Sequence, residues 1–400
     1  MQHGNVETLY DRVQMEGLGT RWALPLWAIG VLGLAGALGL GFVGGEQERF
    51  YRSYLFAWIF FLTVGLGGLF FVLAGHLTRA GWNVAVRRVP EALGAALLPM
   101  AVLSIPVLLG LHQLYPWTDA AHVAASHHLQ AKTPYLNVPF FLVRCAIYFV
   151  SWAGLAWWFL ARSTEQDRTG DPGLTLRMER TATWAIYVFA LTVTFASFDF
   201  LMSLSPEWYS TIFGVYVFAG AAVAAFALTP LVVSALQATG RIEHAVTTEH
   251  MHDLGKLVFA FVVFWAYIGF SQYMLIWYGN IPEETVWYAR RQEAGWAGIS
   301  ILLLVGHFLV PFLLLMSRYP KRRRGTLLLG CLWVLLMHAV DVYWIVMPAG
   351  GPFAPHLLDL LCFVGVGGTF LAGVVEVLRR RPLLPLKDPR LGESLRFENV

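Results

Sequence analysis

Long apolar runs, separated by short polar segments, dominate the chain. A helix that crosses a bilayer needs about 20 mostly apolar residues in succession. Runs of this kind occur at residues 22–43, 54–77, 92–113, 137–162, 182–204, 209–236, 254–278, 293–317, 325–347 and 355–378. The pattern therefore predicts an all-α membrane protein with about ten transmembrane helices.

Composition agrees with this prediction and excludes a soluble globule. Hydrophobic residues make up 57% of the chain and charged residues 13%, and the mean hydropathy is +0.59. The first apolar run follows a polar leader that contains Asp11 and Glu16, and it is too long for a cleaved signal peptide. We therefore expect residues 1–400 to form a single transmembrane domain in which the first run remains as helix 1.

The basic residues are distributed unequally between the two sides of the predicted membrane domain. Of the 28 Lys and Arg residues, 22 fall on the side that would hold both termini and five on the opposite side, while Arg144 lies inside the fourth run. Basic residues favour the cytoplasmic side, so this split predicts two cytoplasmic termini. The net charge of +3 is then a topology signal, and it indicates no nucleic-acid partner.

Turn residues mark several helix boundaries on the predicted outer side. Segment 205–208 (Ser-Pro-Glu-Trp) predicts a helix start, with a capping serine and a proline in the first turn. Segment 281–284 (Ile-Pro-Glu-Glu) predicts another. The longest outer loop, residues 113–136, is either a docking surface or an ordinary solvated loop.

A weak internal repeat is visible in the positions of two aspartates. Asp199 lies seven residues before Pro206, and Asp341 lies seven residues before Pro348. The spacing predicts two parallel four-helix repeats, flanked by helices 1 and 10. The repeats would be two four-helix bundles, formed by helices 2–5 at residues 54–204 and helices 6–9 at residues 209–347.

Ionisable residues inside membrane helices cost about 2.5–3.5 kcal/mol on insertion scales and are functional candidates by default. The candidates in this chain are Arg144, Asp199, His307, His338 and Asp341. A helix rises about 1.5 Å per residue, which places Arg144 and Asp199 at similar depth on adjacent antiparallel helices. We therefore predict that these two side chains pair.

All five candidates suggest proton exchange, with Asp199 as the exchanger nearest the outer side. His338 and Asp341 are three residues apart and share a helix face, while His307 lies near the middle of helix 8. Together the candidate groups could form a transmembrane proton route. The alternative is that each polar side chain only links helices through hydrogen bonds.

The sequence gives no indication of a cofactor held by this chain. The membrane histidines are expected at unmatched depths, which does not suit haem ligation. The three cysteines, Cys145, Cys331 and Cys362, lie singly in different runs and form no metal-binding spacing. We therefore expect no bound metal and no electron transfer by this chain alone.

Three stretches carry a resemblance to a known family: residues 198–214, 253–257 and 264–284. With the ten-helix layout, they resemble the NrfD/PsrC-like integral membrane subunits, and in particular the shorter, ActF-type subunits of bacterial alternative complex III. The resemblance implies two four-helix bundles with two flanking helices. It also implies work in quinol oxidation by a quinol:cytochrome c oxidoreductase of the respiratory chain, in the bacterial cytoplasmic (inner) membrane.

The resemblance further implies partners and cofactors outside this chain. A second NrfD-like subunit, an iron–sulfur subunit and c-type cytochrome subunits are expected, and the assembly could include a terminal oxidase. Haem and iron–sulfur clusters would belong to these partners, while quinone or quinol could bind this chain. Only the Asp199 motif is carried over from the family as a functional position.

Three functions remain open at this point. The first is a non-redox, energy-coupling subunit that supplies a proton route and a scaffold, with no catalysis alone. The second is a quinol-binding subunit that uses Asp199 or a nearby histidine as proton acceptor, and a cleft near helices 3–5 would favour it. The third is a secondary transporter, to which Pro99 and Pro106 in helix 3 point, although no matching pair interrupts helix 7.

Overall fold

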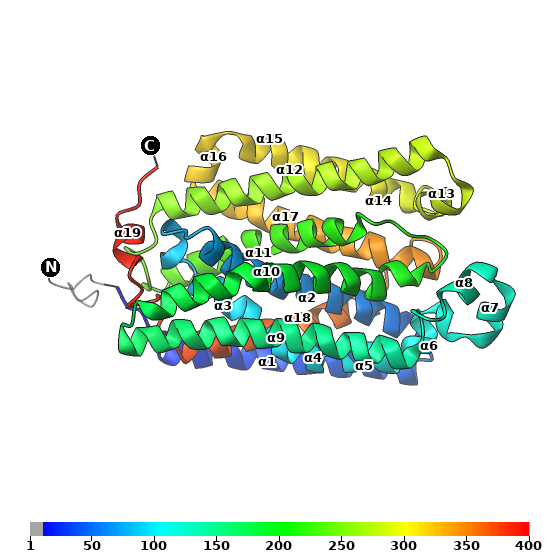
Figure 1. Ribbon diagram of the computed structural model, residues 1–400, viewed down its shortest axis with the longest axis horizontal. Coiled ribbons are helices and arrows are strands. Elements are labelled where there is room, and N and C mark those ends of the chain that lie inside the picture. Colours follow the sequence, from blue (N-terminus) through cyan, green and yellow to red (C-terminus); the bar gives the residue numbers. More distant parts are fainter. Residues whose placement is uncertain (1–10, 400) are drawn as a thin grey trace.

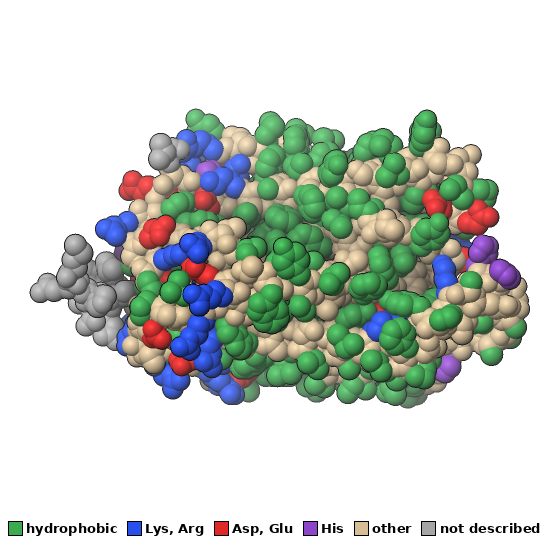
Figure 2. All heavy atoms as spheres, in the orientation of Figure 1, with side chains coloured by type: hydrophobic (Ala, Val, Ile, Leu, Met, Phe, Trp, Pro, Cys, Tyr) green, Lys and Arg blue, Asp and Glu red, His purple; other side chains and the backbone are tan. Residues whose placement is uncertain are grey.

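The computed structural model describes residues 11–399, which are helical almost throughout. Ten helical segments are long and apolar enough to cross a membrane, as the sequence predicts. Figure 2 shows hydrophobic side chains over the middle of the molecule and most charged side chains gathered at its left end. This distribution is typical of an integral membrane protein, because the middle band matches the bilayer core.

The membrane-spanning segments alternate in direction along the chain. Eight spans are α1 with a π-helical end (Gly17–Val43), α2 (Gln47–Leu77), α9 (Val138–Thr169), α10 with a 3-10 end (Gly173–Leu204), α11 (Phe213–Gln237), α12 (Thr248–Gly279), α17 with a 3-10 end (Arg324–Gly350) and α18 (Leu357–Arg379). The third span is broken into α3 (Arg88–Ala95), α4 (Leu97–Val102) and α5 (Ile105–Leu109). The eighth consists of α14 (Trp296–Leu302), a π-helical turn (Leu303–Leu309) and α15 (Val310–Met316).

Shorter α-helices lie between the spans. They are α6 (Leu111–Leu114), α7 (Ala120–Ala125), α8 (His127–Lys132), α13 (Pro282–Ala289) and α16 (Arg318–Arg322), while α19 (Leu391–Leu395) follows the last span.

Helix α2 is the centre of the packing (Figure 1). Its most apolar stretch is 94% buried, against 22% for α1. It contacts α3, α10, α11, α17 and α18. The contact with α11 is close because α2 has a glycine there: a side chain at Gly67 would collide with the carbonyl oxygen of Ala221. Small residues let membrane helices approach in this way.

Helix contacts fall into two groups around this centre. Helices α2, α3, α9 and α10 contact one another, and so do α11, α12, α15 and α17, while α1 packs along α18. The most extensive contact between spans of different groups joins α2 to α11, so the division into bundles of helices 2–5 and 6–9 stays a prediction. Their origin as sequence repeats is a prediction too.

The two ends of the described chain meet at one end of the bundle, which we call the terminal end (Figure 1). There the Leu383 amide donates to the Val13 carbonyl at 2.7 Å. A buried ionic network lies beside this contact: Arg88 is fully buried and donates to Glu91 at 2.7 Å and to Asp167 at 2.6 Å.

Residues 382–399, which we call the tail strap, cross the terminal end. Within the strap, Asp388 accepts a hydrogen bond from Arg87, the residue just before α3, and Arg390 donates to Glu179 of α10 at 2.8 Å. Burial opposes the ionisation of Asp388, but the nearby Arg87 guanidinium outweighs it and holds the pKa of that carboxyl below its ordinary value. The strap thus ties the ends of several helices together through charged groups.

One predicted helix start is wrong. Segment 205–208 does not open a helix, and α11 begins only at Phe213. The intervening chain turns inward instead: Trp208 is 3% exposed and stacks on Trp287 with ring centroids 4.4 Å apart. Burial of this tryptophan outweighs the local helix-start signal. Segment 281–284 does start a helix, but it is the short α13, which precedes the span that begins at Trp296.

The predicted long loop, residues 113–136, lies at the end opposite the termini, which we call the opposite end. It contains α7 and α8, and Lys132 donates to the Pro206 carbonyl at 2.6 Å. The loop is thereby fastened to the segment that precedes α11.

Candidate functional site

Arg144 of α9 and Asp199 of α10 form a buried ion pair, which confirms their predicted contact. Arg144 Nε and Nη2 each donate to one carboxylate oxygen of Asp199 at 2.8 Å. Asp199 is 0% exposed and Arg144 is 6% exposed. Tyr148, one turn after Arg144, adds a third hydrogen bond to Asp199 at 2.6 Å. The carboxylate is therefore held by a bidentate, charge-assisted contact and a hydroxyl.

The start of α9 also positions this pair. Asn137 caps the helix by accepting from the Phe140 amide, and the backbone just before the cap folds over Arg144. Arg144 Nη1 donates to the Tyr135 carbonyl at 2.9 Å, and its guanidinium lies 3.9 Å from the centre of the Tyr135 ring. Burial, and then the charge of Asp199, raise the pKa of Tyr135 to about 12. The phenol therefore stays neutral at physiological pH.

Asp341 of α17 lies in a different setting. It accepts one hydrogen bond from the Tyr216 hydroxyl of α11 and one from Trp265 Nε1 of α12, the latter at 3.0 Å. It is 2% exposed, and within residues 11–399 it forms no ion pair. A carboxyl group with only neutral partners can exchange a proton without breaking an ion pair.

The two membrane histidines are neighbours, so the expectation of unmatched depths is wrong. Their ring centroids are 6.4 Å apart. His307 lies in the π-helical turn of residues 303–309, and its ring packs against Trp265 with centroids 3.9 Å apart. His307 lies near the middle of its span, as counting predicts, and its contact with His338 depends on how α17 packs against this turn.

The histidines retain unused hydrogen-bonding atoms. His338 Nε2 is 2.9 Å from the Thr63 hydroxyl of α2, whereas His338 Nδ1 and both ring nitrogens of His307 have no protein partner in the described chain. Buried polar atoms are usually satisfied, so unpaired ones often mark functional positions or water sites. Here the unused atoms are imidazole nitrogens, which can accept or donate a proton.

A glycine brings His338 and Asp341 against the same point of α11. A side chain at Gly220 would place its Cβ 2.8 Å from His338 Cε1 and 3.9 Å from Asp341 Oδ2. We call the buried group around this point the central cluster. It consists of Thr63, Tyr216, Trp265, His307, His338 and Asp341.

The structure therefore divides the five predicted site residues between two places. Arg144 and Asp199 pair in the first bundle, and the other three lie in the central cluster. Sequence reasoning missed the partners Tyr148, Tyr216 and Trp265. Since the chain has 15 tyrosines and 16 tryptophans, mostly inside apolar runs, nothing in the sequence singles these three out.

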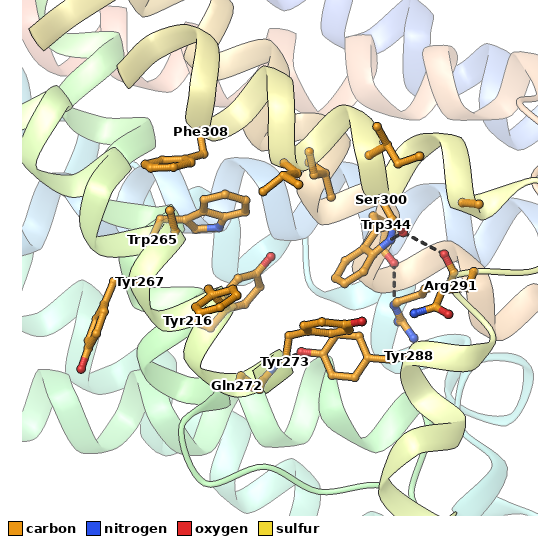
Figure 3. A pocket seen from close by; sticks show the side chains of 18 of the residues that line it. Tyr216, Trp265, Tyr267, Gln272, Tyr273, Tyr288, Arg291, Ser300, Phe308 and Trp344 are labelled. Atoms are coloured by element: carbon orange, nitrogen blue, oxygen red, sulfur yellow. Dashed lines mark hydrogen bonds between the residues drawn. The ribbon is translucent and has the colours of Figure 1, made fainter. Parts of the chain in front are cut away.

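A cavity of about 840 Å³ lies between α12, α13 and α14 (Figure 3). Tyr216 and Trp265 belong both to its wall and to the central cluster, and Arg291 lies toward its other end. A cleft near helices 3–5 would have favoured a quinol-binding subunit, whereas this cavity lies mainly along helices 7 and 8. It lies in the half of the membrane domain nearer the opposite end.

Within residues 11–399, no three His, Cys, Asp or Glu side chains are grouped so that they could hold a metal ion. The cysteines are buried singly in α9, α17 and α18.

The fold and the site define a polytopic integral membrane protein with a group of buried ionisable side chains at its centre. Comparison with models of protein families gives no match. Comparison with curated proteins gives none either.

Proposed function

We propose that the chain is an integral membrane subunit of a quinol-oxidising respiratory complex of the alternative complex III type. It contributes a transmembrane proton route and a scaffold, and its partners carry the haem and iron–sulfur groups. The resemblance of residues 198–214, 253–257 and 264–284 supplies the type of complex. In this proposal the membrane is the bacterial inner membrane, with both termini in the cytoplasm.

The central cluster is the observation that carries the proton route. A carboxyl group and two imidazoles lie together deep in the membrane domain. Trp265 donates to Asp341 and packs on His307, and the ring of His307 neighbours that of His338. Such groups are costly in a membrane and are retained mainly where they move ions or protons. Protonation of His338 or His307 would use nitrogens that have no protein partner.

The two aspartates have different roles in this proposal. Asp199 is clasped by Arg144 and Tyr148, so taking up a proton there would disrupt a bidentate ion pair. Asp341 has only the neutral donors Tyr216 and Trp265. The geometry therefore favours Asp341 as the exchanging group and Asp199 as a structural link, although Asp199 carries the family resemblance.

A quinol-binding subunit is the second candidate. The cavity beside Tyr216 and Trp265 favours it, because a ligand there would lie next to the central cluster. A transporter ranks lower. The third span is broken into α3, α4 and α5, but its counterpart α12 runs without interruption from Thr248 to Gly279.

The test uses the whole complex, isolated through another subunit and reconstituted into vesicles. Asp341→Asn and His338→Leu should lower the protons moved per quinol oxidised, with the subunit still assembled. Gly220→Ala should do so as well, because the added methyl group would displace His338. Cys331→Ala, two turns from His338 on α17 and also fully buried, is the matched control. Unchanged proton yield in both Asp341→Asn and His338→Leu would leave only a structural role.

A further inference from the structure

The cavity of about 840 Å³ falls in the size range of ligand sites. It extends from Trp265 and Phe308, deep in the membrane domain, to Arg291, near the opposite end (Figure 3). Its rim carries apolar side chains of the membrane spans, of which Phe270 is 62% exposed and Leu304 is 63% exposed. Because this rim lies on the surface that faces lipid, the cavity can be entered sideways from the bilayer.

Arg291 is the unusual group in the cavity wall. It is 3% exposed, and no carboxylate in the described part of the chain pairs with it. Its guanidinium donates to the carbonyls of Trp344 at 3.2 Å, Trp287 at 2.8 Å and Ile345 at 2.9 Å. Arginine has five N–H donors, so two remain beyond these contacts.

Two aromatic rings contact the Arg291 guanidinium, but no negative group among the described residues neutralises its charge. The guanidinium carbon lies 3.3 Å from the centre of the Trp287 ring and 4.9 Å from that of Trp344. Burial lowers the pKa of Arg291 to about 9, so the side chain remains protonated at neutral pH. A buried cation without a counter-ion is costly, and an anion in the cavity would relieve that cost.

Several polar side chains near Arg291 are already engaged with one another. Gln272 Nε2 donates to the Tyr288 hydroxyl at 2.9 Å, and Trp344 Nε1 donates to Ser300 Oγ at 2.8 Å. Ser300 in turn donates to the Arg291 carbonyl at 2.8 Å. The unmet requirement at this end of the cavity is therefore negative charge, and the remainder of the wall requires an apolar chain.

We propose that this cavity binds one phospholipid from the leaflet at the opposite end, with its phosphate on Arg291. Arg291 lies in the connection between α13 and α14, outside the spans, which is where headgroups are found. From Gln272 to Trp265 is seven residues of α12, or about 10 Å along the helix. An acyl chain can run over this length past Phe270 and Leu304 toward Phe308.

A bound lipid of this kind would also close the cavity. Its acyl chain would cover the cavity face of Tyr216 and Trp265, which hold Asp341 on their other side. Free phosphate would satisfy Arg291 but would leave the apolar wall empty. A neutral amphiphile would fill the wall but leave the charge uncompensated. A phospholipid meets both requirements.

The test measures lipid retention by native mass spectrometry on the purified full-length chain, and it needs no turnover. The chain is exchanged into detergent with phosphatidylglycerol, with diacylglycerol of the same acyl chains, or with a long-tailed quinone. One phosphatidylglycerol should be retained, and the other two should be lost. Retention should fall about tenfold or more in Arg291→Gln, since a charge-assisted hydrogen bond is removed. Lys132→Gln, a cation at the same end outside the cavity, should change nothing.

Two further variants guard against misfolding in Arg291→Gln. Arg291→Lys keeps the charge and should keep the lipid. Ala266→Trp fills the apolar part of the cavity without altering Arg291, and it should also lose the lipid. Equal retention of diacylglycerol or quinone, no retained lipid in the native chain, or undiminished phosphatidylglycerol in Arg291→Gln would each overturn the proposal. None of these results depends on whether protons move through the central cluster.

Discussion

The Arg144–Asp199 pair allows a quantitative prediction about stability. Both side chains are almost fully buried and joined by two hydrogen bonds of 2.8 Å, with Tyr135 and Tyr148 as additional partners. Removing one member of such a pair leaves an uncompensated charge and costs about 3–5 kcal/mol. Replacing both members by apolar residues of similar size can be nearly neutral.

Arg144→Leu leaves the Asp199 carboxylate buried without its bidentate partner, so it should destabilise the chain by about 3–5 kcal/mol.

The assay is a double-mutant cycle on the purified chain in mixed micelles, with unfolding followed by tryptophan fluorescence. Arg144→Leu and Asp199→Leu should each lower the free energy of unfolding, and the double variant should recover most of the loss. The control cycle uses Arg162 and Glu165, a half-exposed pair on the same helix α9 at 2.6 Å, whose coupling should stay below about 1 kcal/mol. If the two Leu substitutions at positions 144 and 199 were additive, the buried pair would not be the source of stability.

Two further predictions concern the ends of the bundle. A cysteine at His128, exposed on α8, should react with an impermeant thiol reagent added to intact cells; reaction only after permeabilisation would reverse the predicted orientation. At the terminal end, Asp388→Asn should release the tail strap to limited proteolysis at neutral pH, while Glu398→Gln, an exposed position, should not. The lowered pKa of Asp388 means that its contribution is present above the unfolded value of about 3.9 and is lost as pH falls further. The strap of the unmutated chain should therefore loosen only below about pH 4. If the unmutated strap were already released at neutral pH, the ion pair of Asp388 would not be what holds it in place.

The ten spans were predictable because each span is a run of apolar residues, and the thickness of the bilayer sets the length of that run. The pairing of Arg144 with Asp199 was predictable for a related reason. Their helices are joined by a short connection, so residue counting gives both depths, and either charge alone would be costly. Regular geometry and one strong energetic requirement were sufficient in this case.

The central cluster could be anticipated only in part. His338 and Asp341 share a face of one regular helix, so counting placed them together. The contact with His307 depends on a π-helical turn, and the contacts with Thr63, Tyr216 and Trp265 depend on how distant helices pack. A similar tertiary effect turned Trp208 inward and displaced the start of α11. Interactions between helices that are far apart in sequence are not encoded in local periodicity.

The tail strap has a consequence for how the protein is made. Residues 382–399 are synthesised after all ten spans, yet Asp388 is the partner of Arg87 at the start of the third span. Until the strap has been synthesised, Glu91 is the acidic neighbour with which Arg87 can pair. The contacts of the strap with Arg87 and Glu179 can therefore form only after all ten spans have been synthesised. This part of the fold is completed late, by ionic contacts between segments far apart in the sequence.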